Sequence, residues 1–300
     1  MNIRAAHQAL LQQTKNSVNH GLARAVAAHH GTLLVAGNIY DFTINDSKLI
    51  YVPQLLMQQL KAAGYCVIQY SKGRGGRIYQ YSSYNSSPEK KNIDQRLRAV
   101  GLLPMLTQDQ AQPADGEVTS FFRSMGRLLQ VATSSGPPLA LVLEYAEHQC
   151  PHEQGNQSES DENLVVAEIL HSLANSPALR RSGNLVICFA RNEYHSLLND
   201  FHRIDYAFPS QAQTESLINY VKQKGRETQR SIYADLAKGF SNGELARLTQ
   251  GMGLKDIESM FRDAQAQDQD LSRNAILEAK AASILRASEG TLSLVRTRDV

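Results

Sequence analysis

Two buried strand-like runs lead into polar side chains that could handle phosphate or a metal ion. The run Leu139–Glu144 ends in a carboxylate, and the run Asn184–Ala190 is followed by Arg191 and Asn192. A carboxylate there could hold a hydrated divalent metal, and an amide could orient a water molecule. The phosphate clamp GxxxxGK[ST] does not occur, and neither does the dipeptide Gly-Lys. The sequence therefore has polar groups suited to a phosphate site without the lysine that would hold the phosphate.

The composition indicates an ordinary soluble globular protein. Of the 300 residues, 42% are apolar and 20% are charged, and the formal charge of +2 is too small to indicate a nucleic-acid or membrane partner. No apolar run reaches the roughly 18 residues that cross a bilayer, and the amphipathic start lacks the apolar block of a secretion signal. The three cysteines form neither a disulfide framework nor a CxxC pair. We expect a cytoplasmic protein.

Buried strands alternate with helical segments through most of the chain, which predicts an α/β fold with a parallel sheet covered by helices on both faces. The expected strands are Thr32–Ala36, Tyr65–Tyr70, Leu139–Glu144, Asn184–Ala190 and Ile204–Phe208, with a short additional strand at Lys48–Tyr51. The expected helices are Ile3–His29, Pro53–Ala63, Glu89–Val100, Val118–Ala132, Glu162–Ala174, Glu193–Phe201 and Gln211–Lys222.

The pattern changes near Gly225, beyond which no strand-like run remains. Short helices are expected there at Ser231–Leu236, Leu245–Leu248, Leu254–Ala266 and Arg273–Arg286. The predicted organisation is an N-terminal helix over residues 1–30, an α/β domain over 31–224 and a small helical domain over 225–300.

Two stretches carry a family resemblance. LVICFARNEYHSLLNDFHRIDYAFPSQAQTESLINYV resembles the sensor-1 strand, arginine-bearing turn, last strand and connecting helix of the AAA+ ATPases. LARLTQGMGLKDIESMFRDA resembles a lid helix that reads LAxxTxGxSGADIxxLxxxA in many AAA proteins. The resemblance implies a P-loop NTPase fold followed by a helical lid.

A more specific resemblance is to bacterial and plastid proteins with two tandem AAA-type modules. The N-terminal module of those proteins lacks the phosphate loop, and the C-terminal one carries it. The terminal stretch EAKAASILRASEGTLSLVRT resembles the joint before such a second module. By analogy, this chain would be the N-terminal half of a longer protein.

The resemblance places the phosphate loop at residues 37–42. Intact family members hold the phosphates there with backbone amides and a lysine. This loop offers Gly37 and Asn38 but no lysine, and Asp41 would repel phosphate. The Walker A motif is absent from this loop. The local chemistry favours a plain turn capped by Asn38 or Asp41 rather than a phosphate-binding loop.

The family's carboxylate strand ends in Asp-Glu, where the aspartate positions Mg²⁺ and the glutamate activates water. This chain has Glu144 and Tyr145 instead. Tyrosine is a poor base because its phenol titrates near ~10. Glu147 would be a substitute base, although an exposed loop carboxylate is the favoured interpretation. Catalytic residues are therefore not expected.

Two further positions are carried over from the resemblance. Asn192 matches the sensor-1 amide, and Lys255 lies where a sensor-2 basic residue sits. Together with Glu144 they would form what remains of a nucleotide cleft. The alternatives are that Asn192 caps the following helix and that Lys255 is a solvated surface residue.

The turn Asn199–Arg203 resembles the family's GRFDR, whose arginines reach into a neighbour's site. Phe201 and Arg203 match the pattern, whereas Asp200 replaces the first arginine. Arg203 could act in trans on another module. The alternative is a surface arginine paired with Asp200 or Asp205.

The segment Ser71–Ser87 is predicted to be a loop or an irregular hairpin that is basic and rich in tyrosine and glycine. Its candidate contact residues are Lys72, Arg74, Arg77 and Tyr79. In hexameric relatives an aromatic loop at this place grips polypeptide. A basic aromatic loop would also stack on single-stranded nucleic acid, and a plain surface loop is the third alternative.

Metal chemistry is not expected elsewhere. His148, Cys150 and His152 are separated by one residue each, and no second cluster completes a tetrahedral site.

Three hypotheses follow, in descending order of preference. The first is a non-catalytic AAA+-like module that regulates or assembles with an active ATPase module, in the same chain or in an oligomer, and that contacts a protein client. It needs no cofactor. The second is a weakly active ATPase that binds ATP or ADP with Mg²⁺ through Glu144, Asn192 and Lys255. The third is a nucleic-acid-binding adaptor that uses Lys72, Arg74 and Arg77.

Overall fold

The computed structural model describes residues 3–15, 19–80, 84–107, 117–131, 136–152, 161–191, 194–227 and 232–287. The chain forms two compact units. The first combines Met1–Ile39 with Pro53–Tyr206, and the second combines Tyr40–Val52 with Ala207–Val300. Each unit is described separately below. The segment that follows the first strand thus groups with the C-terminal helices, which the sequence pattern alone does not predict.

The first unit is built on a six-stranded sheet within the described residues. Its order is β5-β4-β6-β7-β1-β8. The strands are β1 (Thr32–Gly37), β4 (Cys66–Ser71), β5 (Gly75–Ile78), β6 (Leu139–Leu143), β7 (Leu185–Ala190) and β8 (His202–Tyr206). Every pairing is parallel except that of β4 with β5, which is antiparallel. The expected α/β fold is confirmed, with one antiparallel edge strand added.

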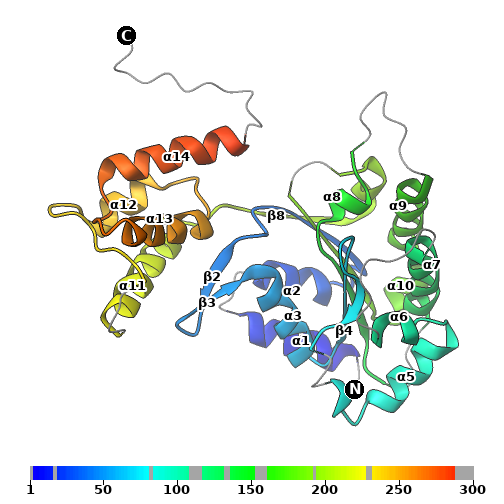
Figure 1. The fold of residues 1–300 in the computed structure, drawn as a ribbon. Coiled ribbons are helices and arrows are strands. Elements are labelled where there is room, and N and C mark those ends of the chain that lie inside the picture. The colour runs from blue at the N-terminus through cyan, green and yellow to red at the C-terminus, as the bar shows by residue number, and fades with distance from the viewer. Residues whose placement is uncertain are drawn as a thin grey trace. The chain divides into compact units, whose positions relative to one another are not determined.

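Helices cover both faces of this sheet (Figure 1). One face carries α1 (Ile3–Thr14), α2 (His20–Ala27) and α3 (Val52–Ala62). The opposite face carries α5 (Lys90–Ala99), α6 (Leu103–Thr107), α7 (Glu117–Gln130), α9 (Asp161–Ala174) and α10 (Pro177–Ser182). The central strands β6 and β7 are buried at every residue. Strands buried on both sides must be apolar throughout, which is why LALVL and LVICFA lack the alternation of a surface strand.

The position of β1 determines which groups meet at one edge of the sheet. The chain passes from β1 to β4, two strands beyond its neighbour β7, then returns through β6 and β7 and finally places β8 on the far side of β1. In open α/β sheets ligands bind at the carboxyl ends of strands near such a change of direction. Gly37, Glu144 and Arg191 follow or end β1, β6 and β7 at this edge.

Several local expectations were wrong. Residues 196–200, expected within a longer helix, form the 3-10 helix η1 (Ser196–Asp200). Residues 232–236, expected to be helical, contain no helix, and Leu236 instead forms a single β-bridge with Leu271. Of the two alternatives for the segment after β4, a loop or an irregular hairpin, the structure has a hairpin, in which β5 pairs with β4.

The second unit is a helical bundle with a two-stranded hairpin. Its helices are α11 (Gln211–Glu227), α12 (Asn242–Leu248), α13 (Leu254–Ala266) and α14 (Arg273–Ala287), and its hairpin is β2 (Phe42–Asn45) with β3 (Lys48–Tyr51). Phe42, Ile44 and Leu49 of the hairpin pack on the apolar core formed by these helices. None of the described helices in either unit has the length and apolar character needed to span a bilayer.

Gly37, the last residue of β1, is sterically required to be glycine. Its φ is +102°, and a Cβ there would lie 2.6 Å from the carbonyl oxygen of Tyr206. We therefore expect Gly37→Ala to destabilise the first unit by about 1–3 kcal/mol, because alanine would add both backbone strain and a clash.

Urea unfolding followed by circular dichroism measures this cost. Gly73→Ala is the matched control, since a Cβ at Gly73 meets no atom within 4 Å. Equal stability of the two variants would contradict this role of Gly37.

Candidate functional site at the carboxyl end of the sheet

The backbone amides that follow β1 are already hydrogen-bonded to carbonyl oxygens of the same unit. The amide of Gly37 donates to Arg191 (3.0 Å), that of Asn38 to Tyr206 (2.9 Å) and that of Ile39 to Gly37 (2.9 Å). The first two bonds arise because β1 lies between β7 and β8 and continues each parallel ladder by one bond. A phosphate group at this loop would have to displace these bonds rather than occupy donors held open for it.

Asp41 caps helix α13 within the second unit. Its Oδ2 accepts from the amide of Leu254 (2.8 Å), and its Oδ1 accepts from the amides of Lys255 and Phe42 (2.7 Å each). The residue is only 4% exposed. The first amides of a helix have no partner within the helix and attract anions. A carboxylate from residue 41 therefore fills the anion site at the start of α13.

The hairpin and Gly253 make this contact geometrically feasible. The amide of Val52, directly after β3, donates to the carbonyl oxygen of Asp41 (3.0 Å). The hairpin turn uses Asp46 and Ser47, both with positive φ (48° and 57°), as two-residue hairpin turns require. A Cβ on Gly253 would lie 3.1 Å from Oδ2 of Asp41, so the small residue before α13 leaves room for the carboxylate.

Glu144 is buried and engaged by a neighbouring strand. The Nε2 of Gln69 on β4 donates to Oε2 of Glu144, and the Nε of Arg77 on β5 donates to Oε1 of Gln69 (3.0 Å). Glu144 is 8% exposed. An arginine, an amide and a carboxylate thus form a hydrogen-bonded chain across β5, β4 and the end of β6. The Glu144 carboxylate is held by the protein itself rather than directed into open solvent.

The residues after Glu144 are not arranged as a water-activating pair. Tyr145 has a left-handed backbone (φ 56°), and its ring stacks on that of His148 at 5.6 Å. Glu147 lies on the short helix α8 (Ala146–Gln149), where burial raises the pKa of its carboxyl. The expectation that Glu147 is an exposed loop carboxylate was wrong, because α8 turns it partly into the protein.

Arg203 lies on β8 with its side chain 56% exposed. Its Nε donates to Oδ1 of Asp205 (2.8 Å), and its Nη1 donates to the hydroxyl of Tyr194 (2.8 Å). These bonds fix the direction of the guanidinium, and the carboxylate of Asp205 raises its pKa further. Of the two pairings considered from the sequence, the one with Asp205 is present.

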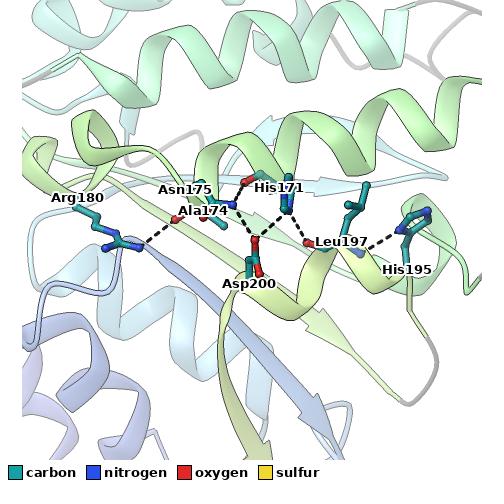
Figure 2. Close-up of polar contacts among 7 residues, drawn as sticks. All are labelled: His171, Ala174, Asn175, Arg180, His195, Leu197 and Asp200. Atoms are coloured by element: carbon teal, nitrogen blue, oxygen red, sulfur yellow. Dashed lines mark hydrogen bonds and ion pairs between the residues drawn. The ribbon is translucent and has the colours of Figure 1, made fainter.

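Asp200, which replaces the family's first arginine, is tied to helix α9 (Figure 2). Its Oδ2 accepts from Nδ2 of Asn175 (2.7 Å) and lies 3.2 Å from Nδ1 of His171. The same His171 nitrogen lies 3.3 Å from the carbonyl oxygen of Leu197. The amide of Leu197 in turn donates to Nδ1 of His195 (3.1 Å). Asp200 therefore anchors the η1 turn to α9 and the residue that follows it.

Three of the four candidate contact residues are exposed, two of them in the β4–β5 turn. Lys72 and Arg74 are exposed, and the Nζ of Lys72 donates to the carbonyl oxygen of His148 (3.4 Å). Arg77 is exposed too, but its Nε is committed to Gln69. Tyr79 is half-buried, and burial raises the pKa of its hydroxyl. Of the predicted residues, Lys72 and Arg74 therefore have the positive charges most accessible to a partner.

The remaining predicted positions divide between the units. Gly37, Asn38 and Glu144 belong to the same edge of the sheet in the first unit. Lys255 is in the second unit, at the start of α13, where its amide binds Asp41. Asn192 lies outside the described residues.

The residues of the described segments do not suit a metal. They contain no group of three or more His, Cys, Asp or Glu side chains placed to hold an ion. The three cysteines are buried, and burial raises the pKa of Cys66 to about 12 and that of Cys188 well above its ordinary value. Buried thiols of this kind behave as small apolar side chains.

Two functional contacts were missed in the sequence. Gln69 could have been suspected, because a polar residue inside the buried run YCVIQY must find a partner. The partner of Asp41 has no local signal, because residues 41 and 254 are more than two hundred positions apart.

The sheet order, the polar groups at its carboxyl edge and the separate helical unit define an α/β domain of the P-loop NTPase type with helical parts. A family model described as the N-terminal Rossmann-like domain of AAA+ chaperones matches residues 20–195. Because that match covers more than half of the chain, the protein belongs to this family.

No curated protein sequence matches the chain. Among solved structures it is similar to a chain of the HORMA–CdnC–Trip13 complex of E. coli MS115-1, with 10% sequence identity and a TM-score of 0.45. The similarity covers 93% of this chain and 84% of that one. Similarity at this level does not bear on function.

We predict that Asp41→Ala loosens the start of α13. Loss of an N-cap costs about 1–2 kcal/mol, which corresponds to roughly tenfold faster exchange of the first amides of the helix. Amide hydrogen exchange at residues 254–257 measures this effect.

Asp263→Ala, at an exposed position late in the same helix, is the control for charge removal. If the two variants exchanged alike at residues 254–257, the capping role of Asp41 would be refuted.

Proposed function

We propose that this chain is a non-catalytic AAA+ module of the chaperone type, which assembles with and regulates an active ATPase module in the same chain or in an oligomer. In this role it neither needs nor hydrolyses a nucleotide of its own. The observation that carries the proposal is the contact of Asp41 with α13, because residue 41 lies in the loop where the family holds phosphate.

The groups that could receive a phosphate are occupied by the protein. The Asp41 carboxylate neutralises the start of α13, and carbonyl oxygens bind the amides of Gly37, Asn38 and Ile39. The loop has no lysine, and Asp41 adds a negative charge to it. A triphosphate would therefore meet electrostatic repulsion and would break existing hydrogen bonds, two costs that an intact phosphate loop does not impose.

The carboxylate strand also favours a non-catalytic role. Glu144 is held by Gln69, and a tyrosine, Tyr145, stands at the place that the resemblance gives to the water-activating glutamate. Glu147 follows on α8, and burial raises the pKa of its carboxyl, so it would be available as a base in the alternative of a weakly active ATPase.

Such a module would act through residues on its surface that contact other proteins. Arg203, oriented by Asp205 and Tyr194, would reach the site of an active neighbour, and the exposed Lys72 and Arg74 would face a protein client. Membership of a family of N-terminal AAA+ chaperone domains supports action beside a second module. We also propose a cytoplasmic location, on the basis of the composition.

Isothermal titration of the purified chain with ATP and Mg²⁺ tests the nucleotide part of the proposal. We expect no binding at micromolar concentrations, and the same result for Glu144→Ala. An intact P-loop ATPase titrated in the same buffer is the positive control. A micromolar constant that disappears in Glu144→Ala would instead support a nucleotide-binding, weakly active ATPase.

The trans role of Arg203 has its own test in the native complex with the active ATPase. An arginine that stabilises phosphoryl transfer in a neighbour contributes at least about tenfold to kcat. Arg203→Ala should therefore lower kcat of the complex without changing its assembly. Arg123→Ala removes an exposed arginine from α7 and should leave kcat unchanged. Equal kcat values for the two variants would refute the trans role.

A further inference from the structure

The first forty residues contain no aspartate or glutamate. They contain the cations Arg4, Lys15 and Arg24, together with four of the chain's nine histidines. These histidines are His7, His20, His29 and His30. Histidine is the side chain whose charge changes between about pH 5 and 8. Mild acid would therefore add several positive charges to this segment without any carboxylate of its own to balance them.

Two of these histidines follow α2 and each contacts the ring of another histidine. The rings of His7, on α1, and His29 have centroids 5.2 Å apart. The rings of His30 and of His202, the first residue of β8, stack at 3.9 Å with an interplanar angle of 13°. Contacts between four imidazoles thus join α1, the connection from α2 to β1, and β8.

These contacts suit neutral rings. His7 is 6% exposed, and within the described residues its Nε2 is buried without a hydrogen-bond partner. Burial, and then the nearby His29, lower the pKa of His7 to about 4. Burial also lowers the pKa of His30, with further contributions from His202 and Arg180.

The elements around these rings offer cations rather than free carboxylates. The sequences of α1, α2, β1 and α10 contain no acidic residue, whereas α10 carries Arg180 and Arg181. On β8 the one carboxylate, Asp205, is paired with Arg203. Asp200, just before β8, is bound by Asn175 and His171. A proton taken up by His7 or His30 would therefore place positive charge against another imidazole ring, and at His30 also near Arg180.

We propose that the helical pair α1–α2 is a pH-responsive element, held in place by contacts between neutral histidines and loosened when those rings are protonated. This inference is independent of the proposed function, since it involves neither nucleotide nor partner. The pair precedes β1 directly, so acid would weaken the packing beside the strand that leads into the candidate site.

The direction of the pH effect follows from the lowered pKa values. A ring whose pKa is lower in the folded state than in the unfolded chain binds its proton less tightly when folded. The stabilisation from neutral His7 is therefore complete above its ordinary pKa of 6.5, and it is lost as the pH falls from there towards about 4. His30 acts in the same direction.

The chain has no tryptophan, so the fluorescence of a single introduced tryptophan reports on the surroundings of that one position. Leu11→Trp places it at a half-buried position of α1, and Val131→Trp, after α7, reports on the opposite side of the sheet. In the full chain, fluorescence between pH 8 and pH 4 should show a transition at residue 11 before any change at residue 131.

His7→Gln with His30→Gln should move that transition to lower pH by about one unit, because two of the titrating groups are gone.

His152→Gln removes an exposed histidine outside the cluster and should leave the transition in place. Raising the salt concentration to 1 M, without the histidine substitutions, should also lower the pH midpoint of the residue-11 transition, because salt screens repulsion between the rings. This measurement needs no histidine variant to fold. A midpoint insensitive to salt and to the double substitution would overturn the proposal. So would simultaneous transitions of the two reporters.

Discussion

The contact between Asp41 and the first turn of α13 is the interaction on which the packing of the second unit depends. A buried carboxylate is costly unless it is hydrogen-bonded, and here three backbone amides and the positive end of a helix satisfy it. Because the contact uses both carboxylate oxygens, it fixes the start of the β2–β3 hairpin as well as the start of α13. The hairpin then buries Phe42, Ile44 and Leu49 in the helical core. Residue 41 and the hairpin that follows it are thus part of the packing of the second unit.

In the first unit, the end of β1 is constrained by its close packing against β7 and β8. Gly37 has a positive φ, and a Cβ at this position would clash with the carbonyl oxygen of Tyr206, so both its backbone conformation and its surroundings require glycine. The following amides extend the ladders to β7 and β8. Glycine at this place is therefore explained by strand packing alone, and it need not be a remnant of a phosphate loop. The same holds for Glu144, whose burial beside Gln69 and Arg77 gives it a structural function within the sheet.

The sequence predicts those features that depend on local pattern. Apart from Thr32, the runs TLLVA, LALVL and LVICF are apolar throughout, which indicates strands covered on both faces, and all three form adjacent strands of the sheet. The resemblance of residues 185–221 to the AAA+ sensor region placed the correct family. Contacts distant in sequence could not be predicted: Asp41 with Leu254, Gln69 with Glu144, and His30 with His202 join segments that no periodicity relates. The expected helix at 231–236 failed for the same reason, since pairing with Leu271 overrides its weak helical pattern.

Asp41 binds the start of α13, and carbonyl groups bind the amides of Gly37, Asn38 and Ile39, so we propose that residues 37–42 hold no nucleotide. A crystal structure of the chain grown with saturating ADP and Mg²⁺ tests it most directly. The account predicts that residues 37–42 carry no nucleotide and that both Asp41 oxygens still accept from Leu254 and Lys255. Ordered ADP with its phosphates bound by the amides of residues 37–42, and Asp41 released from α13, would contradict it.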